Sequence, residues 1–208
     1  MTGVGGADRV SGIVLAGGAS RRFGADKLTV TVEGSSMLER AVASVAAISA
    51  EVIVVVAPGD DRPLPVDAVA VPVRRAEDPE THGGPLVGLL AGLEAAREPI
   101  AVVAGGDMPT LSVDVLHALV RSLLAAEGTV DAAILVRHGV DRPLPAVVRN
   151  GAATQAARRV LGEGERSLVA LFRTLATRRV AEADWRGLDP SGETLRDVDT
   201  PADLPGQS

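Results

Sequence analysis

Two uninterrupted runs of apolar residues constrain the fold of this 208-residue chain more than any other feature. Residues 52–57 read Val-Ile-Val-Val-Val-Ala, and residues 100–104 read Ile-Ala-Val-Val-Ala. A strand with one face in water alternates apolar and polar residues, whereas these runs contain no polar position. They therefore predict parallel strands that are covered by other elements on both faces.

Helical and strand segments alternate along the rest of the chain. Residues 36–48 place Leu38, Val42 and Val45 at helical spacing, and residues 84–97 carry a proline near a helix start. Further helices are expected at 112–126, 151–161 and 167–176, and further strands at 10–16, 28–32, 69–73, 132–136 and 145–149. This alternation predicts an α/β fold, a single domain with a mainly parallel sheet and helices on both faces. We expect the domain to occupy residues 1–208, with residues 1–9 disordered and residues 205–208 as a tail.

The composition excludes several classes of function. The formal net charge of -6 argues against general binding to nucleic acid, which needs a basic face. The chain has no cysteine, so disulfides, zinc–thiolate sites and thiol nucleophiles are excluded. Its first residues lack a signal-peptide core, and no apolar run approaches the roughly 20 residues that cross a bilayer. We expect a cytoplasmic protein without nucleic-acid or membrane partners, either a monomer or a weak homo-oligomer.

A glycine-rich, basic loop follows the first predicted strand. Residues 15–27 read Leu-Ala-Gly-Gly-Ala-Ser-Arg-Arg-Phe-Gly-Ala-Asp-Lys. Gly17 and Gly18 allow backbone N–H groups to approach a phosphate, while Arg21 and Lys27 add charge for a triphosphate. The loop lacks both the ending of a Walker loop and the G-x-G-x-x-G dinucleotide pattern. It predicts a different kind of triphosphate-binding loop; the alternative is a glycine turn with a solvated basic flank.

Three aspartates complete the set of candidate site residues. Asp107 follows the strand at 100–104 in the turn Gly-Gly-Asp-Met-Pro, where a carboxylate could hold Mg²⁺ beside phosphate oxygens. Both this turn and the glycine loop lie at carboxyl ends of predicted strands, where α/β sheets bind ligands. Asp78 precedes a Gly-Gly-Pro turn and could accept hydrogen bonds from a base or ribose. Asp199 is a candidate second metal ligand, although Thr200 and the proline after it also read as a helix start.

The ordered motifs of the chain resemble those of molybdenum cofactor guanylyltransferases and their MobA-like relatives. The loop at residues 15–27 resembles the family signature L-A-G-G-x-S-x-R-M/F-G-x-D-K. The resemblance then continues through Glu77-Asp78, Gly84-Pro-Leu-x-Gly88, Gly106-Asp-Met-Pro109, Arg142-Pro143, Gly164-Glu-Arg166 and Asp197-Val-Asp-Thr-Pro201. It covers almost the whole chain, and the ordered set is more specific than the first motif.

The resemblance implies a single domain of the nucleotide-diphospho-sugar transferase type, which is Rossmann-like. It also implies transfer of GMP from GTP to the phosphate of molybdopterin with Mg²⁺, and transient contact with other cofactor-biosynthesis proteins. At the matching positions it implies GTP binding by the backbone of Leu15, Ala16 and Gly17, and phosphate contacts by Lys27. Asp78 would contact the nucleotide, and Asp107 would bind both GTP and Mg²⁺.

Three departures from the family pattern leave alternatives open. Relatives often carry Cys before the metal aspartate, Asn at the position of Val55, and Asn-x-Asn in place of Asp197-Val-Asp199, whereas this chain has Gly106, Val55 and the two aspartates. The nearest alternative activity is a molybdopterin cytidylyltransferase, and the next is a nucleotidyltransferase acting on a sugar or alditol phosphate. A non-catalytic nucleotide-binding protein is the alternative from a different class.

Overall fold

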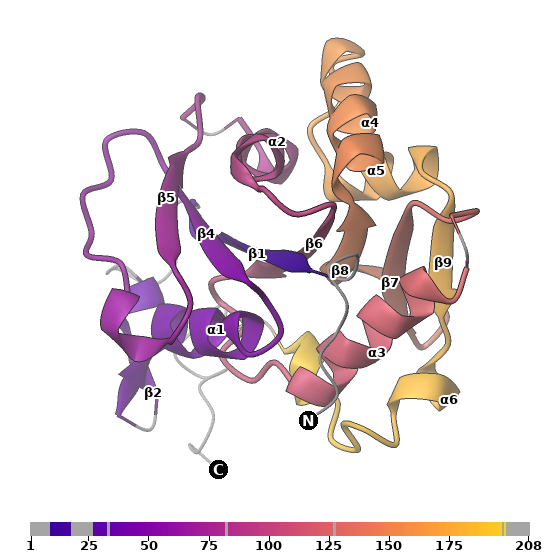
Figure 1. Cartoon of the computed structure of the whole chain (residues 1–208), viewed down its shortest axis with the longest axis horizontal. Coiled ribbons are helices and arrows are strands. Elements are labelled where there is room, and N and C mark those ends of the chain that lie inside the picture. Colours follow the sequence, from indigo (N-terminus) through magenta and orange to yellow (C-terminus); the bar gives the residue numbers. More distant parts are fainter. Residues whose placement is uncertain are drawn as a thin grey trace.

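A single seven-stranded sheet forms the centre of the protein, with helices packed on both of its faces (Figure 1). The computed structural model describes residues 9–17, 27–32, 34–81, 83–126, 128–196 and 198. The disorder expected at residues 1–9 and the tail expected at 205–208 lie outside these residues, apart from Arg9.

The sheet is mainly parallel, as predicted. Its strand order is β5 (Val73–Glu77), β4 (Glu51–Val56), β1 (Val10–Leu15), β6 (Ile100–Gly105), β8 (Val140–Arg149), β7 (Ala132–Arg137) and β9 (Thr177–Val180). Only β8 runs antiparallel to its neighbours in this sheet. The carboxyl ends of β5, β4, β1 and β6 therefore lie along one edge, which is where the predicted ligand loops begin.

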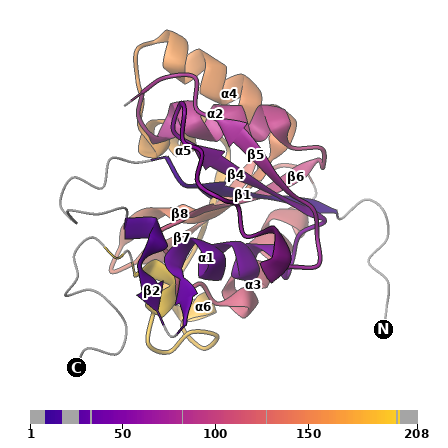
Figure 2. The same ribbon diagram turned by 90° about the vertical axis from the view of Figure 1, so that its left-hand side faces the viewer.

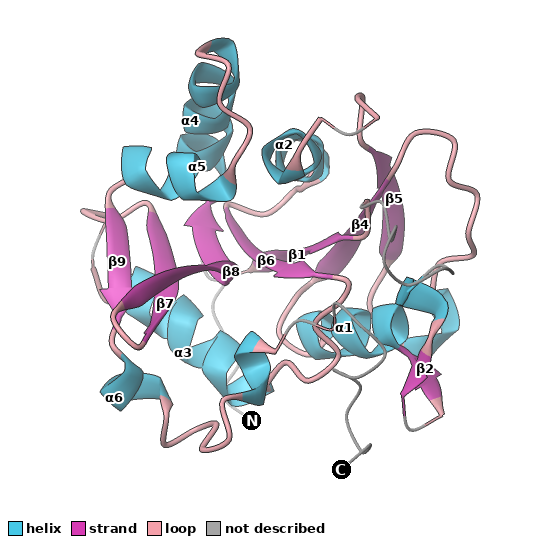
Figure 3. Cartoon of the chain, turned by 180° about the vertical axis from the view of Figure 1, so that it is seen from behind, coloured by secondary structure: helices cyan, strands magenta, loops and turns pink. Residues whose placement is uncertain are grey.

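Side chains of successive strand residues enter two separate cores. Val14 and Val54 pack with α1 (Met37–Ala46), α3 (Val113–Leu124) and α6 (Glu182–Trp185). Ile13 and Ile53 pack with α2 (Pro85–Ala95), α4 (Asn150–Gly162) and α5 (Leu168–Thr174). Figures 2 and 3 show these two helix layers on opposite sides of the sheet. The burial of both faces explains why β4 and β6 contain no polar side chain after Glu51.

Three predicted strands differ from the observed elements. The strand expected at 69–73 begins only at Val73, after a 3-10 turn η2 (Val66–Ala68), because β5 is an edge strand whose position is set by pairing with Val52–Val56. The strand expected at 28–32 is a 3-10 turn η1 (Lys27–Thr29) followed by a short hairpin of β2 (Thr31–Val32) and β3 (Ser35–Ser36). The strand expected at 145–149 starts earlier, at Val140, and its pairing with β7 is irregular after Ile134.

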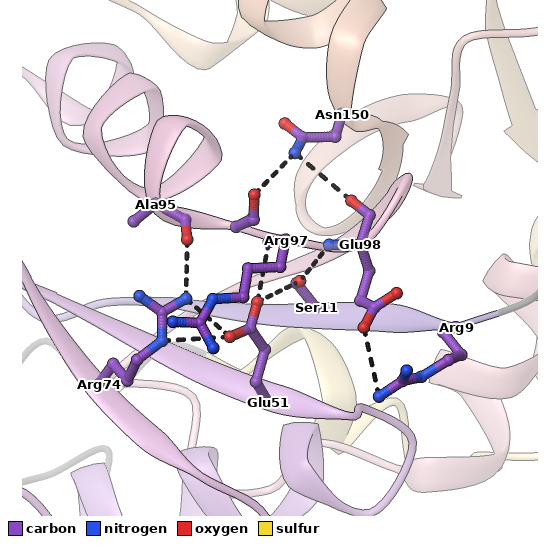
Figure 4. Close-up of polar contacts among 9 residues, drawn as sticks. Arg9, Ser11, Glu51, Arg74, Ala95, Arg97, Glu98 and Asn150 are labelled. Carbon is purple, nitrogen blue, oxygen red and sulfur yellow. Dashed lines mark hydrogen bonds and ion pairs between the residues drawn. The ribbon is translucent and has the colours of Figure 1, made fainter.

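A buried polar network closes the amino-terminal edge of the sheet, opposite the predicted site (Figure 4). Glu51 accepts hydrogen bonds from the hydroxyl of Ser11 at 2.8 Å, the guanidinium of Arg74 at 2.7 Å and the backbone N–H of Arg97 at 2.9 Å. Burial alone would raise the pKa of Glu51, but these hydrogen bonds lower it below its ordinary value. The network joins the starts of β1, β4 and β5, and its role is structural.

Candidate functional site

Main-chain hydrogen bonds join the ends of the three central strands at the carboxyl edge of the sheet. The N–H of Ala16 donates to the carbonyl of Val55 at 2.7 Å, and the N–H of Gly106 donates to the carbonyl of Leu15 at 2.9 Å. Leu15 and Ala16 therefore pass between the ends of β4 and β6 before the chain reaches Gly17, which is exposed. The predicted backbone contact residues thus lie beside the predicted metal turn.

The turn that carries Asp107 is built so that its carboxylate crosses the end of β6. The N–H of Met108 donates to the carbonyl of Gly105 at 3.3 Å, which closes the turn. A Cβ atom placed on Gly105 would lie 2.5 Å from Asp107 Oδ1, so only glycine leaves room for the carboxylate in this position. Asp107 is partly buried and makes further contacts within the protein.

Asp78 lies beside the first turns of α2 and is 8% exposed. Its N–H donates to the carbonyl of Val56 at 2.8 Å, which fixes it just beyond the end of β5. Its Oδ1 accepts the N–H of Glu80 at 2.9 Å, while Oδ2 would be 3.3 Å from a Cβ atom placed on Gly88. One carboxylate oxygen therefore holds the loop, and the other faces the glycine of the helix, where it can accept a hydrogen bond from a ligand.

The loop from Asp78 to α2 is also tied to the segment before α5. Arg166 Nη1 forms an ion pair with Glu80 Oε2 at 2.7 Å, and the N–H of Leu86 donates to the carbonyl of Arg166 at 3.2 Å. Two of the motifs that carry the family resemblance, at residues 84–88 and 164–166, thus come together although they are far apart in the sequence. Both side chains of the ion pair are about half exposed, so the pair itself contributes little stability.

Several predicted site residues lie outside the described part of the chain. They are Gly18, Arg21, Asp197 and Asp199, and for Lys27 only the backbone, at the start of η1, is described. Leu28, the residue after Lys27, is buried, and its Cδ2 would lie 3.4 Å from a Cβ atom on Gly106. The chain therefore returns from the glycine loop to the metal turn at Leu28.

The chemistry of the described donors fits a magnesium ion that is held mostly by substrate. Among the residues that the structure describes, no group of three or more His, Cys, Asp or Glu side chains could hold a metal by itself. Mg²⁺ commonly uses one or two carboxylates and completes its shell with phosphate oxygens and water. Asp107, next to a loop suited to a triphosphate, matches that requirement.

A contact that the sequence did not predict attaches the C-terminal part of the chain to this site. The N–H of Val198 donates to the carbonyl of Asp107 at 3.2 Å, and Val198 is fully buried. Before it, Asp189, Thr194 and the 3-10 turn η3 (Glu193–Leu195) form a compact turn beside the start of α3. The only local signal is Asp-Pro-Ser-Gly at 189–192, a common turn sequence.

Known proteins are similar to this chain over most of its length. Residues 12–180 match the family model described as the MobA-like NTP transferase domain. A probable molybdenum cofactor guanylyltransferase from Chloroflexus aggregans is 34% identical over 198 residues, covering 94% of this chain and 91% of the relative. One of the same description from Mycobacterium marinum is 37% identical over 205 residues, covering 94% and 92%.

Solved structures share the fold at lower sequence identity. Molybdopterin-guanine dinucleotide biosynthesis protein A from Archaeoglobus fulgidus superposes with a TM-score of 0.72 at 23% identity, covering 93% of this chain and 94% of that one. A nucleotidyl transferase from Methanothermobacter gives 0.68 at 21% identity, with 94% of each chain covered. No helix in the described part of the chain is long and apolar enough to cross a membrane.

Proposed function

We propose that this chain, which belongs to the MobA-like NTP transferase family, transfers GMP from GTP to the phosphate of molybdopterin and releases pyrophosphate. The relatives that match it over more than nine-tenths of its length carry the corresponding name. The observation that carries the proposal is the hydrogen bond from Gly106 to Leu15, which brings the glycine loop and the Asp107 turn to one place. Nucleotidyl transfer needs a triphosphate-binding loop and a metal carboxylate side by side.

Each predicted residue has a defined task in this proposal. The backbone of Leu15, Ala16, Gly17 and Gly18 binds GTP. The cationic side chains of Arg21 and Lys27 neutralise the triphosphate. The free carboxylate oxygen of Asp78 accepts hydrogen bonds from the nucleoside.

Asp107 is the residue that would hold Mg²⁺ and, with it, the phosphates of GTP. The bound ion would supply charge neutralisation for the leaving pyrophosphate. Asp199 is a candidate second ligand, supported by the bond between Val198, the residue before it, and the carbonyl of Asp107. Asp197 precedes Val198 in the sequence and is the other carboxylate of the Asp197-Val-Asp199 motif.

The reaction requires no protein nucleophile and no general base. A phosphate monoester has a second pKa near about 6, so the acceptor phosphate is mostly dianionic at neutral pH. One of its oxygens forms a bond to the α-phosphorus of GTP, and the bond from that phosphorus to the bridging oxygen breaks, so that pyrophosphate leaves with the electron pair. The protein aligns the two phosphates and neutralises the leaving group.

The choice of base and acceptor is decided by assay. The purified chain is incubated with Mg²⁺, molybdopterin and either GTP or CTP, and pyrophosphate release is measured. We expect release with GTP. Release with CTP alone would identify a cytidylyltransferase, the alternative that stays open because Val55 stands where relatives often carry Asn. Release only with a sugar or alditol phosphate would change the acceptor, and nucleotide binding without release under any acceptor would contradict the enzyme assignment.

The proposal also covers the location, oligomeric state and partners of the protein. We expect it to act in the cytoplasm as a monomer or weak homo-oligomer, and to meet other cofactor-biosynthesis proteins transiently. Size-exclusion chromatography with light scattering over a range of concentrations tests the oligomeric state.

A further inference from the structure

A single buried carboxylate organises the turn that precedes the C-terminal segment. Asp189 is 7% exposed and accepts hydrogen bonds from the hydroxyl of Ser191 at 3.0 Å and from the backbone N–H groups of Gly192, Glu193 and Thr194 at 2.9, 3.2 and 2.8 Å. Burial alone would raise the pKa of Asp189, but these hydrogen bonds lower it below its ordinary value. The carboxylate therefore determines the shape of residues 191–194.

This turn is attached to the loop that follows Asp107. The hydroxyl of Thr110 donates to the carbonyl of Glu193 at 2.8 Å, and the N–H of Ser112 donates to the hydroxyl of Thr194 at 3.0 Å. Thr194 is fully buried. The attachment is visible in Figure 1, where the yellow end of the described chain lies beside the first turn of α3.

A third attachment reaches Asp107 itself. The N–H of Val198 donates to the Asp107 carbonyl at 3.2 Å, and the Val198 side chain packs in a small cluster with Val32 and Met37. We call residues 189–196 and Val198 the clasp. The clasp forms one hydrogen bond with the main chain of Asp107 and two with the loop that follows Asp107. The C-terminal part of the chain therefore holds the Asp107 peptide in place.

We infer that Asp189 is a positioning residue for nucleotidyl transfer, because the clasp that it shapes fixes the main chain from which the Asp107 carboxylate projects. The inference rests on the proposed function. If the clasp opens, the Asp107 peptide can rotate, and the carboxylate no longer occupies one position. A misplacement of about 1 Å in a reacting site can lower the rate about 100-fold.

The test uses Thr110→Val, which removes the hydroxyl group that donates to Glu193 of the clasp while it keeps the shape of the side chain. Thr177→Val is the matched control, because the Thr177 hydroxyl donates to the carbonyl of Phe172 at 2.8 Å on β9, away from Asp107. Thr110→Ser keeps the donor. Amide hydrogen exchange at Val198 reports whether the clasp is closed, and titration of GTP binding with Mg²⁺ reports the metal requirement without any turnover.

Thr110→Val is expected to speed exchange at Val198 and to raise the Mg²⁺ concentration for half-maximal GTP binding, each about three- to tenfold, as one lost hydrogen bond predicts. Asp189→Asn is expected to give a larger effect of the same kind, and Thr110→Ser to resemble the wild type. Thr177→Val should lower the melting temperature without changing exchange at Val198 or the Mg²⁺ requirement.

Two results would overturn the inference. One is faster exchange at Val198 with an unchanged Mg²⁺ requirement, which would make the clasp a purely structural element. The other is unchanged exchange in Thr110→Val, which would mean that this bond does not hold the segment. A wild-type protein that binds GTP with Mg²⁺ but releases no pyrophosphate would overturn the proposed function instead, and the exchange and binding data would still decide on the clasp.

Discussion

The backbone N–H of Gly106 donates to the carbonyl of Leu15 at 2.9 Å, and this bond joins the end of β1 to the turn that carries Asp107. The two residues are 91 positions apart, and only the parallel pairing of β1 with β6 brings them together. The start of the glycine loop and the turn of the candidate metal ligand therefore lie side by side because of the sheet topology. Substitutions at this junction should affect chemistry more than folding.

Asp107→Asn is expected to abolish turnover while it leaves the fold intact. The amide keeps the size of the side chain but loses the charge that binds Mg²⁺. Pyrophosphate release should fall at least about 100-fold, with a melting temperature near that of the wild type. Asp114→Asn is the matched control, because Asp114 is an exposed carboxylate in the first turn of α3. Retained activity in Asp107→Asn would remove this residue from the mechanism.

Gly105→Ala tests whether the position of the Asp107 carboxylate matters, because this variant keeps the carboxylate but displaces it. The new Cβ atom would lie 2.5 Å from Asp107 Oδ1, and a side-chain oxygen can move away where backbone could not. We expect activity to fall about 10- to 100-fold and the Mg²⁺ requirement to rise, with little loss of stability. Gly151→Ala, on an exposed turn of α4 with no atom within 4 Å of the new Cβ, should instead stabilise by up to about 1 kcal/mol. Equal activity in both variants would argue against a fixed carboxylate.

The sequence predicted the central strands well and the edge strand poorly, for one physical reason. β4 after Glu51 and the whole of β6 are buried on both faces, so their residues carry no polar side chain and the strands can be located from the sequence alone. β5 reads Val-Arg-Arg-Ala-Glu and pairs on one side only. Its position depends on the register Val52↔Val73, which no local pattern encodes.

The same distinction applies to the site. Gly17 and Asp107 could be named as candidates because glycines and a carboxylate follow recognisable buried strands, and Leu15 because of the family resemblance. Asp189 could not, because most of its partners are backbone N–H groups, and the turn that it shapes reaches the loop after Asp107 through hydrogen bonds between residues 83 and 82 positions apart. Ordinary turn residues acquire their role only when the chain folds.

Glu51→Gln should destabilise the protein without changing the activity of the folded enzyme. Glu51 is buried at the edge of the sheet opposite the site and accepts charged hydrogen bonds from Arg74, so we expect a loss of about 1–3 kcal/mol at pH 7 in urea unfolding. Glu94→Gln removes an exposed ion pair with Arg158 at 2.8 Å and should cost less than about 1 kcal/mol.

The Glu51 contribution should also depend on pH. The folded-state pKa lies below the ordinary value of 4.5, so the stabilisation is complete above that value and is lost as pH falls through the folded pKa. The difference in unfolding free energy between wild type and Glu51→Gln should therefore be largest near neutral pH and should shrink below pH 4.5. A difference that is constant with pH would mean that lost packing, not charge, causes the destabilisation.

Asp78→Asn should weaken GTP binding while it preserves the loop. The amide oxygen can still accept the Glu80 N–H, whereas the group that replaces Oδ2, opposite Gly88, becomes a donor and no longer accepts from the nucleoside. We expect KM for GTP to rise about 10- to 100-fold, as for a lost charged hydrogen bond, with kcat at saturating GTP nearly unchanged. Asp78→Ala loses both oxygens and should also lower the melting temperature, because the Glu80 N–H loses its acceptor. A GTP affinity in Asp78→Asn equal to that of the wild type would mean that the base is recognised elsewhere, and that Asp78 serves only the turn.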